Sequence, residues 1–377
     1  MKKASFLSCF LVLALVSCGR APATVCAVFG TLESGDTARI WHLENTSGAS
    51  LDLTDYGARI VRIVMPDRYG RYDDVAVGYG TLSSFEKGDR FIGPVIGRYG
   101  NRIDHASFIL DGKEYVLDAN ESFDGEPVQC HGGNEGFDRK IWRGSVLSGS
   151  GSSGVRFSRL SPDGEGGFPG NLETSVTYWL TEDDRVVIEY EAMTDAPTVV
   201  NLSNHTYFNL KGSSGGYVMD HLLRVEADSC IQNNRHFCPD LVLGVDGSPF
   251  DFRTPQRVDY RLDMENEHLR IMHGMSACWL IRGYDGSLRL AADLYDRGCG
   301  RGVQTWTTEP SILTFTGRTF SGDKYPDGKY GPIEKYSGML LETIHLPDSP
   351  NQPRFPSTVL RPGEKYYSRT EYRFYTK

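Results

Sequence analysis

Two residues of this sequence, His205 and Glu342, have side chains suited to proton transfer. Both stand in sequence surroundings that are unusual for a titratable group. His205 lies in a strand-like run, residues 199–210, that is rich in Asn and hydroxyl side chains. A buried His surrounded by amides is either a core residue whose hydrogen bonds are satisfied or a group kept in one tautomer for proton transfer. Glu342 follows an apolar run, residues 339–341. Partial burial raises the pKa of a carboxyl group toward that of a useful general base; the alternative is that the strand ends there and Glu342 meets water.

Two glycine-rich stretches supply further polar candidates. Asn101 and Arg102 lie in residues 93–103, where the glycines suggest close backbone packing and the two side chains offer fixed donors. His131 stands directly before two glycines, where a sharp bend exposes the ring to a ligand. The alternatives are a surface turn with solvated arginines and a structural turn His. Taken singly, none of these residues decides between a functional role and a purely structural or solvent-exposed one.

The elements that must position these residues are strands, because the apolar pattern has a period of two rather than 3.6. Asp111 and Gly112 supply the positive φ values of a tight hairpin turn. Hairpins are predicted in residues 107–117, 287–295 and 333–342, and between residues 172–180 and 185–191. No segment of helical period reaches a dozen residues. The 42 glycines and 18 prolines are spread throughout, so we predict an all-β fold, a large antiparallel β-sandwich.

Residues 146–154 are rich in Gly and Ser and match the spacing of a dinucleotide-binding loop at Gly149, Gly151 and Gly154. That loop requires a helix immediately after it, whose N–H groups face the pyrophosphate. Here residues 155–158 are strand-like. We therefore expect a long hairpin loop and no nucleotide site.

The composition is ordinary for a globular protein, with 24% charged residues and a net charge of −9. The chain has no block of Lys and Arg, and an acidic surface repels phosphate backbones, so a nucleic-acid partner is not expected.

The first residues predict export. Lys2 and Lys3 precede an apolar run, residues 6–16, that is too short to cross a bilayer as a stable helix. The run ends in Leu15-Val16-Ser17-Cys18-Gly19, which resembles a bacterial lipobox. By that resemblance Cys18 becomes the lipidated first residue of the mature chain.

The alternative is ordinary cleavage nearby, after Ala23 or Ala27. The expected division is a lipoprotein signal peptide at residues 1–17, a lipidated linker at 18–28 and one catalytic domain at 29–377. The expected location is the periplasm or outer membrane of a bacterium, with the lipid as the sole membrane attachment.

Eight cysteines occur, and six remain once Cys9 and Cys18 are set aside. In an oxidising compartment some of them can pair, and Cys230 with Cys238 is the nearest candidate pair. No C-x-x-C pair is present, so neither a zinc site nor thioredoxin-type chemistry is indicated.

Taken together, the segments resemble one family over nearly the whole mature chain. The stretches LDLTDYGARIVRIVMPDRYG, GRYGNRI, HGGNEGFDRKIW, NLSNHTYFNL, LETIHLPDSPNQPRFPS and LRPGEKY occur in the order found in aldose 1-epimerases, also called galactose mutarotases. The resemblance covers residues 29 to 375. It implies a single large β-sandwich with an open groove, no cofactor and no metal, and a free aldose as substrate.

The resemblance also implies roles for individual residues. Glu342 matches the general base and His205 the general acid of the family. His131 matches a second active-site His that binds sugar hydroxyls, and Asn101 and Arg102 match a substrate-binding pair.

Two positions depart from the family pattern. Ser276 stands where the family carries a substrate-binding Asp, and Leu313 stands at the Gln of the pattern PGxQxYTGN, which here runs from Pro310 to Arg318. An Asp accepts two hydrogen bonds from neighbouring hydroxyls, and its loss costs on the order of tenfold to a hundredfold in affinity. We therefore expect altered substrate choice with retained chemistry.

Three other functions compete with this interpretation. The first is a non-catalytic sugar-binding paralogue, against which the retention of His205 and Glu342 argues. A phosphosugar epimerase needs a basic phosphate pocket, and export removes most phosphosugars. A glycoside hydrolase needs two carboxylates flanking the bond, and only Glu342 stands in a motif of that character.

Overall fold

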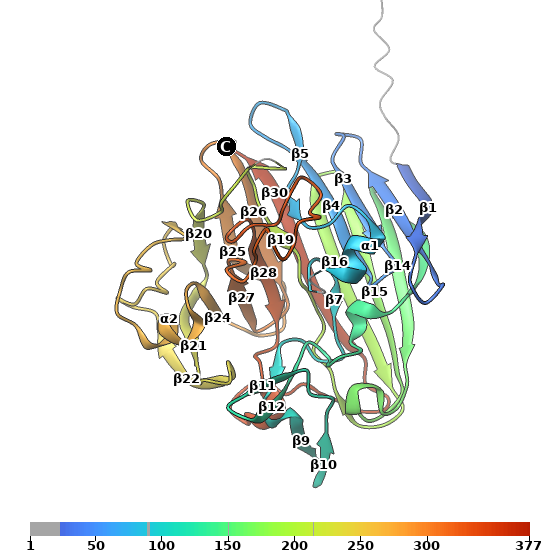
Figure 1. Cartoon of the computed structure of the whole chain (residues 1–377), viewed down its shortest axis with the longest axis vertical. Helices are drawn as coiled ribbons and strands as arrows, with labels where there is room; N and C mark the ends of the chain where they lie inside the picture. Colours follow the sequence, from blue (N-terminus) through green and yellow to red (C-terminus); the bar gives the residue numbers. More distant parts are fainter. Residues whose placement is uncertain (1–22, 89–90, 150, 214) are drawn as a thin grey trace, which may run out of the picture.

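A computed structural model of the chain describes residues 23–88, 91–149, 151–213 and 215–377. The proposed signal peptide and Cys18 lie outside the described residues. Two large antiparallel sheets and a smaller five-stranded sheet dominate the molecule (Figure 1). The prediction of an all-β antiparallel fold is confirmed. In the described part of the chain, no helix is long and apolar enough to cross a membrane.

Three sheets form the body of the fold. The nine-stranded sheet has the order β13 (Arg143–Gly149), β14 (Ser152–Ser161), β15 (Leu172–Thr181), β16 (Arg185–Thr194), β30 (Tyr366–Thr376), β26 (Arg301–Thr307), β25 (Arg289–Tyr295), β20 (Leu222–Val225), β23 (Gln256–Arg257). The seven-stranded sheet has the order β22 (Pro239–Gly244), β21 (Ala227–Asn233), β24 (Ser276–Ile281), β27 (Ser311–Phe315), β28 (Met339–Ile344), β19 (Tyr207–Phe208), β6 (Ala76–Val77). The five-stranded sheet runs β1 (Ala23–Thr31), β2 (Thr37–Glu44), β3 (Ser50–Thr54), β4 (Arg59–Pro66), β5 (Tyr72–Asp74).

Smaller elements complete the fold at the lower end of Figure 1 and around the cavity. The small sheets are β11 (Glu121–Phe123) with β12 (Glu126–Cys130) and β8 (Arg102–Ile103), β9 (Ser107–Leu110) with β10 (Lys113–Val116), β7 (Val95–Ile96) with β18 (Ser203–Asn204), and β17 (Thr198–Val199) with β29 (Val359–Leu360). The helices are short: α1 (Leu82–Lys87), α2 (Glu267–Met272) and the 3₁₀ turns Asp104–Ala106, Phe137–Arg139, Glu165–Gly167 and Ser349–Asn351.

The sheets pack face to face over one large apolar core, and β28 shows how a strand serves both this core and a cavity. Its side chains alternate between the two faces, as in any strand. Met339 and Leu341 belong to the core cluster, whereas Leu340 and Glu342 line a cavity on the other side. Tyr372 ties the layers together, because its hydroxyl donates a hydrogen bond to the carbonyl of Leu341 at 2.9 Å.

Two of the predicted hairpins are confirmed. Strands β9 and β10 form the hairpin of residues 107–117, and its turn residues Asp111 and Gly112 have φ values of 52° and 78°. Strands β15 and β16 pair as predicted from Leu172↔Thr194 to Leu180↔Val186. In both cases two adjacent strands joined by a short turn satisfy each other's backbone hydrogen bonds. The hairpin can therefore be predicted from the local sequence.

Three local predictions are corrected. Residues 287–295 and 333–342 are not hairpins: each contributes a single strand, β25 and β28, whose partners come from elsewhere in the chain. The apolar alternation was right, but the partners lie outside the predicted ranges: β25 pairs with β26 and β20, and β28 pairs with β27 and β19. Residues 146–154 do join a hairpin, but β13 and β14 pair as far as Gly149↔Ser152, so the connection is tight rather than a long loop.

The expected linker at residues 18–28 ends earlier than expected, because β1 already begins at Ala23 and pairs with β2 from there. All six described cysteines are free. The suggested pairing of Cys230 with Cys238 is therefore wrong: Cys230 lies opposite Leu243 in the β21–β22 hairpin, whereas Cys238 lies at its turn end.

Candidate active site

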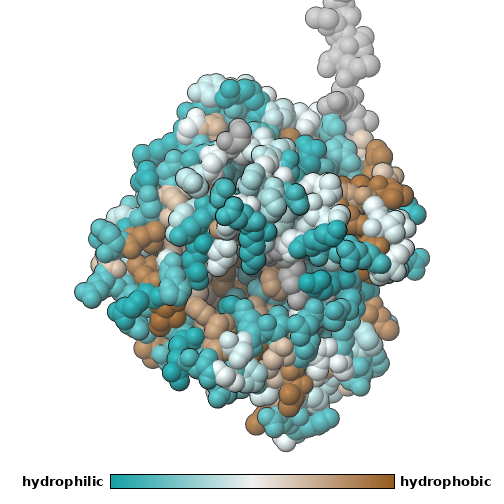
Figure 2. All heavy atoms as spheres, in the orientation of Figure 1, coloured by the Kyte–Doolittle hydropathy of each residue, from teal (hydrophilic) through white to brown (hydrophobic). Residues whose placement is uncertain are grey.

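A cavity of about 390 Å³ opens on the face of the seven-stranded sheet that points away from the core. Figure 2 shows this side of the molecule hollowed near its middle. Antiparallel pairing places side chains of neighbouring strands side by side. The floor of the cavity consists of two such rows on β24, β27 and β28: Cys278, Leu313 and Glu342 in one, and Ser276, Phe315 and Leu340 in the other.

The sequence-predicted pair meets in this cavity. Nε2 of His205 lies 4.0 Å from Oε2 of Glu342. Glu342 is fully buried and His205 is 7% exposed, so the alternative of a solvated Glu342 at a strand end is wrong. Neither carboxylate oxygen of Glu342 has a hydrogen-bond partner among the described residues. Since 4.0 Å is longer than a hydrogen bond, both groups keep their capacity to exchange protons with a third molecule.

Polar side chains before His205 fix this segment against β28. The side-chain amide of Asn201 donates to the carbonyl of His345 at 3.3 Å and accepts from its N–H at 3.1 Å. The hydroxyl of Ser203 donates to the carbonyl of Thr343 at 2.8 Å. These bonds extend the sheet pairing through side chains, which explains why the run around His205 is rich in Asn and hydroxyl groups.

The ring of His205 is held by its backbone and by neighbouring rings. Its N–H donates to the carbonyl of Pro94 at 3.0 Å, and its carbonyl accepts from the N–H of Gly93 at 2.9 Å. The ring centroid lies 5.0 Å from that of His131 and 5.3 Å from that of Tyr207. Both contacts are edge-to-face, so the neighbouring rings restrict the plane of the imidazole in the cavity.

Burial shifts the pKa values of the pair in opposite directions. It raises the pKa of Glu342 to about 8, against a smaller opposing effect of the Ser203 hydroxyl. It lowers the pKa of His205 to about 4. Desolvation penalises the charged form of each group. Between these values the pair holds a single proton, and burial favours that proton on Glu342, whereas the general-acid role expected of His205 places it on the imidazole.

His131 faces the pair from the opposite wall, on the turn after β12. Its Nδ1 accepts a hydrogen bond from the backbone N–H of Asn101 at 3.2 Å, so in the neutral ring the proton is on Nε2. Asn101 and His131 have φ values of 62° and 53°, a left-handed conformation that non-glycine residues rarely adopt. The next residue, Gly132, has φ 90°, which confirms the predicted bend at the two glycines.

Arg102 lies in the same wall, and the carboxylate of Glu121 neutralises its charge. Its Nε and Nη2 donate to the two oxygens of Glu121 at 2.6 and 3.0 Å, and its guanidinium lies 5.3 Å from the ring centroid of Phe237. A forked ion pair of this kind fixes the guanidinium plane. The structure thus brings all the predicted catalytic and sugar-binding residues into one cavity, and adds Glu121 to them.

Comparison with known proteins decides the family. A family model described as Aldose 1-epimerase matches residues 39–373. Galactose mutarotase of Homo sapiens is 37% identical over 351 residues, covering 92% of this chain and 97% of that protein. The chain belongs to the aldose 1-epimerase family. Aldose 1-epimerase of Escherichia coli is 32% identical over 343 residues, covering 90% of this chain and 96% of that protein.

Solved structures agree on the fold. A galactose 1-epimerase from Lactobacillus acidophilus superposes with a TM-score of 0.81 at 23% identity, covering 94% of this chain and 99% of that one. An aldose epimerase homologue from C. elegans superposes with a TM-score of 0.78 at 26% identity and the same coverage.

The two departures from the aldose 1-epimerase pattern both lie on the cavity floor. Leu313 is half-buried and is the direct cross-strand neighbour of Glu342. Ser276 is 4% exposed, and its carbonyl is bonded to Nε2 of His268 at 2.8 Å. The floor beside Glu342 therefore offers an apolar side chain at Leu313 and a hydroxyl at Ser276.

Sequence reasoning missed several lining residues. Tyr207 lies two positions after His205, and strand alternation could have placed it on the same face. Arg318 ends the pattern that was compared with the family and also lines the cavity. Phe237 and Glu121 stand in turn-rich segments without a local signal, and only the folded chain brings them to the site.

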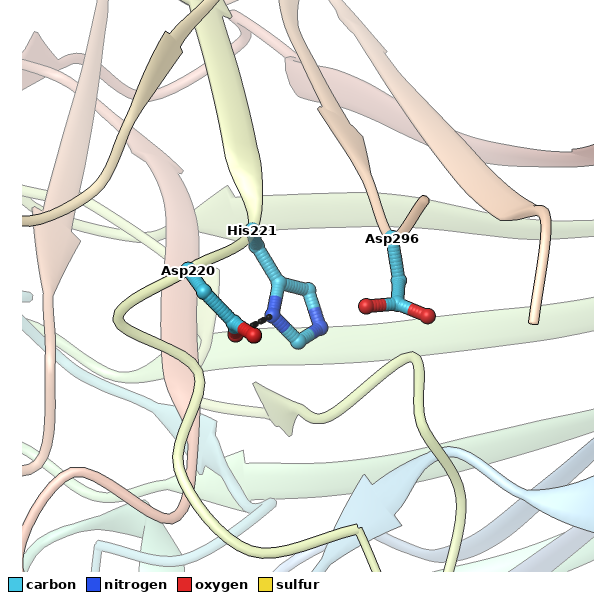
Figure 3. A group of neighbouring side chains, drawn as sticks. All are labelled: Asp220, His221 and Asp296. Carbon is cyan, nitrogen blue, oxygen red and sulfur yellow. Dashed lines mark ion pairs between the residues drawn. The ribbon is translucent and has the colours of Figure 1, made fainter. Parts of the chain in front are cut away.

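A second group of titratable side chains, Asp220, His221 and Asp296, has the composition of a metal site but lies outside the cavity (Figure 3). The ammonium of Lys211 already lies 2.7 Å from Asp220. Nε2 of His221 accepts the N–H of Leu210 at 3.2 Å, so the ring proton is on Nδ1, the nitrogen that faces Asp220 at 3.6 Å. Asp296 accepts the N–H of Cys299 at 2.8 Å. Each carboxylate of the group therefore has a partner from the protein, and we assign no metal to it.

Proposed function

We propose that this protein is an aldose 1-epimerase, an isomerase that interconverts the α and β anomers of a free aldose. The observation that carries the proposal is the buried pair of His205 and Glu342, 4.0 Å apart on the cavity floor. Membership of the aldose 1-epimerase family supports it. Anomer exchange needs one group that removes a proton and one that supplies a proton, both next to the anomeric carbon.

In the ring-opening step, Glu342 removes the proton of the anomeric hydroxyl while Nε2–H of His205 protonates the ring oxygen. The bond between the anomeric carbon and the ring oxygen breaks, and its electron pair goes to the ring oxygen. The anomeric oxygen forms the carbonyl of the open-chain aldehyde. Glu342 ends this step protonated and His205 neutral.

Ring closure reverses these transfers after the aldehyde end has rotated. Neutral His205 removes the proton of the chain hydroxyl as that oxygen attacks the other face of the carbonyl, and protonated Glu342 returns a proton to the anomeric oxygen. The pair therefore carries one proton throughout, and turnover only moves it between the two groups. The protonation that burial favours, with the proton on Glu342, is the form that closes the ring.

The remaining predicted residues are proposed to hold the sugar. His131 lines the cavity and carries its ring proton on Nε2, because Nδ1 accepts the N–H of Asn101, and it is proposed to bind a ring hydroxyl. Arg102 has Nη1 without a hydrogen bond to any described residue. Ser276 and Asn101 add a hydroxyl and an amide to the lining. All of these groups recognise hydroxyls, as a free aldose requires.

The decisive experiment follows the optical rotation of freshly dissolved α-galactose and α-glucose. We expect equilibrium to be reached faster in proportion to protein concentration, and not with the Glu342→Gln variant. A non-catalytic sugar-binding paralogue would bind the sugars without this acceleration. Identical rates with and without protein, across several aldoses, would contradict the proposed activity.

The location of the protein is proposed from its N-terminus. We expect export and lipidation at Cys18, which lies outside the described residues; the lipobox-like residues 15–19 support this. A Cys18→Ser variant is expected to lose its lipid by mass spectrometry and to move from the membrane to the soluble fraction. An unchanged distribution between the fractions would contradict lipid anchoring.

A further inference from the structure

Arg318 brings a positive charge into the cavity that no described carboxylate matches. It forms no ion pair with a described residue, and its Nε is buried without a hydrogen-bond partner there. Its guanidinium lies 5.5 Å from the ring centroid of Phe315, a neighbour on the cavity floor. Burial, together with the charge of Arg102, holds the pKa of Arg318 below its usual range. The side chain thus lies in a site that lacks a counter-ion.

Arg318 stands at the same end of the cavity as Ser276. Ser276 pairs with Phe315, three residues before Arg318. The hydroxyl of Thr316 donates to the carbonyl of Met275 at 3.3 Å, and a Cβ on Gly274 would lie 3.6 Å from Cδ of Arg318. The segment before Ser276 and the segment that carries Arg318 therefore lie side by side.

The other charges of the cavity do not compensate Arg318. The two oxygens of Glu121 are both bonded by Arg102. Glu342 belongs to the proton-transfer pair on the opposite strand of the floor, and position 276 is an uncharged serine. The guanidinium of Arg318 is thus left without a counter-ion among the described residues, at the end of the cavity that also holds Ser276, in a protein whose net charge is −9.

The separation suits the length of one sugar. Ser276 lies two strands across and two residues along from Glu342, so sheet spacings place their Cα atoms roughly 12 Å apart. The two side chains rise from the same face of the sheet, and the distance between them leaves room for a single pyranose ring. A sugar with its anomeric carbon at His205 and Glu342, and with its ring laid along the floor toward Ser276, brings carbons 4 to 6 toward Arg318.

We propose that the preferred substrate is a hexuronic acid, an aldose whose carbon 6 is a carboxylate, bound by the guanidinium of Arg318 and the hydroxyl of Ser276. The inference rests on the proposed epimerase activity and names its substrate class. The planar fork of a guanidinium matches a carboxylate with two parallel hydrogen bonds. One guanidinium balances the single charge of a carboxylate, whereas a doubly charged phosphate ester would need a further cation, and Arg102 is already taken by Glu121.

The test compares matched sugars in exchange between anomers, measured by NMR at equilibrium at pH 7. The substrates are galactose, galacturonate and galactose 6-phosphate, and glucose with glucuronate. For the wild-type chain we expect kcat/KM for each uronate to exceed that for its neutral hexose at least tenfold. In Arg318→Gln this ratio is expected to fall roughly 10- to 100-fold, chiefly through KM.

Two further variants make the comparison specific. Arg143→Gln removes one positive charge from β13, where Arg143 is exposed and outside the cavity; the ratio is expected to stay at its wild-type value. Ser276→Asp places a carboxylate beside Arg318 and is expected to lower the ratio while raising efficiency on the neutral hexoses. This variant keeps the proposal testable if Arg318→Gln does not fold.

The outcomes separate the two proposals. Turnover of neutral hexoses with a uronate ratio at or below one, or a ratio that Arg318→Gln leaves unchanged, would overturn the hexuronate assignment and leave the epimerase proposal intact. Greater efficiency on galactose 6-phosphate than on galacturonate would also overturn it. No acceleration with any of the sugars would contradict the epimerase activity itself.

Discussion

Glu342 is a fully buried carboxylate without a hydrogen-bond partner among the described residues, 4.0 Å from His205. Replacing it with Gln keeps the shape of the side chain but removes its basicity. We expect Glu342→Gln to lower kcat by about 10²–10⁴-fold, the usual contribution of a positioned acid or base. Sugar binding should persist, because the lining groups remain.

Polarimetry measures the loss of turnover, and saturation-transfer NMR with galactose measures the retained binding. A variant with a nearly normal rate would remove Glu342 from the role of base. A variant that neither turns over nor binds would show instead that the cavity had collapsed.

The pH dependence follows from the same pair. Below the pKa of about 4 of His205 both groups are protonated and no base is left; above the pKa of about 8 of Glu342 both are deprotonated and no acid is left. We expect a plot of kcat/KM against pH, corrected for the uncatalysed reaction, to be bell-shaped with its maximum between these two values. The acidic and basic limbs of that plot report the titration of the pair as a whole. A profile with a single limb near pH 6.5 would indicate that one ordinary His governs the rate.

At the scale of elements, the turn after β12 shows how the backbone sets the site. Gly132 follows His131 with φ 90°, and a Cβ there would lie 2.0 Å from the carbonyl oxygen of Gly97. No flexible side chain can relieve that clash, because the oxygen belongs to the backbone. The two glycines after a His could be recognised in the sequence, but the contact with Gly97, far away in the chain, could not.

We expect Gly132→Ala to destabilise the fold by roughly 3 kcal/mol or more, or to displace His131 and abolish activity. Gly112→Ala is the control: Gly112 also has a positive φ, 78°, but no atom lies within 4 Å of its Cβ position. This change should cost only about 1 kcal/mol. Thermal unfolding of the two variants tests the difference, and equal losses would show that the φ value alone matters.

At the scale of the molecule, alternation along the sequence was enough to predict an antiparallel all-β fold, because each strand carries its own signal. The order of strands was not predictable. Strand β30 lies between β16 and β26, and the two-residue strand β19 lies between β28 and β6. Such pairings join distant segments through backbone bonds that any residue can make. For the same reason His205 and Glu342 could be chosen from sequence, whereas the Arg102–Glu121 pair and the unmatched Arg318 required the folded chain.

The whole molecule also bears the energetic cost of the site. Glu342 has a pKa of about 8 in the folded chain against 4.5 for an ordinary Glu. Well below pH 4.5 Glu342 is protonated in both the folded and the unfolded state, so its titration does not change the free energy of folding. As pH rises toward 8 the unfolded chain ionises more readily, so folding loses stability, on the order of 3–5 kcal/mol in total.

Glu342→Gln removes this titration. We therefore expect the variant to unfold at nearly the wild-type temperature at pH 5 and several degrees higher at pH 8 to 9. Glu173→Gln, which changes an exposed carboxylate on β15, should alter the unfolding temperature little at either pH. If the gain in unfolding temperature of Glu342→Gln did not grow with pH, the carboxylate of Glu342 would not be desolvated in the folded chain. The same desolvation supports the role of Glu342 as the base. Stability and catalysis are thus expected to oppose each other at this one residue.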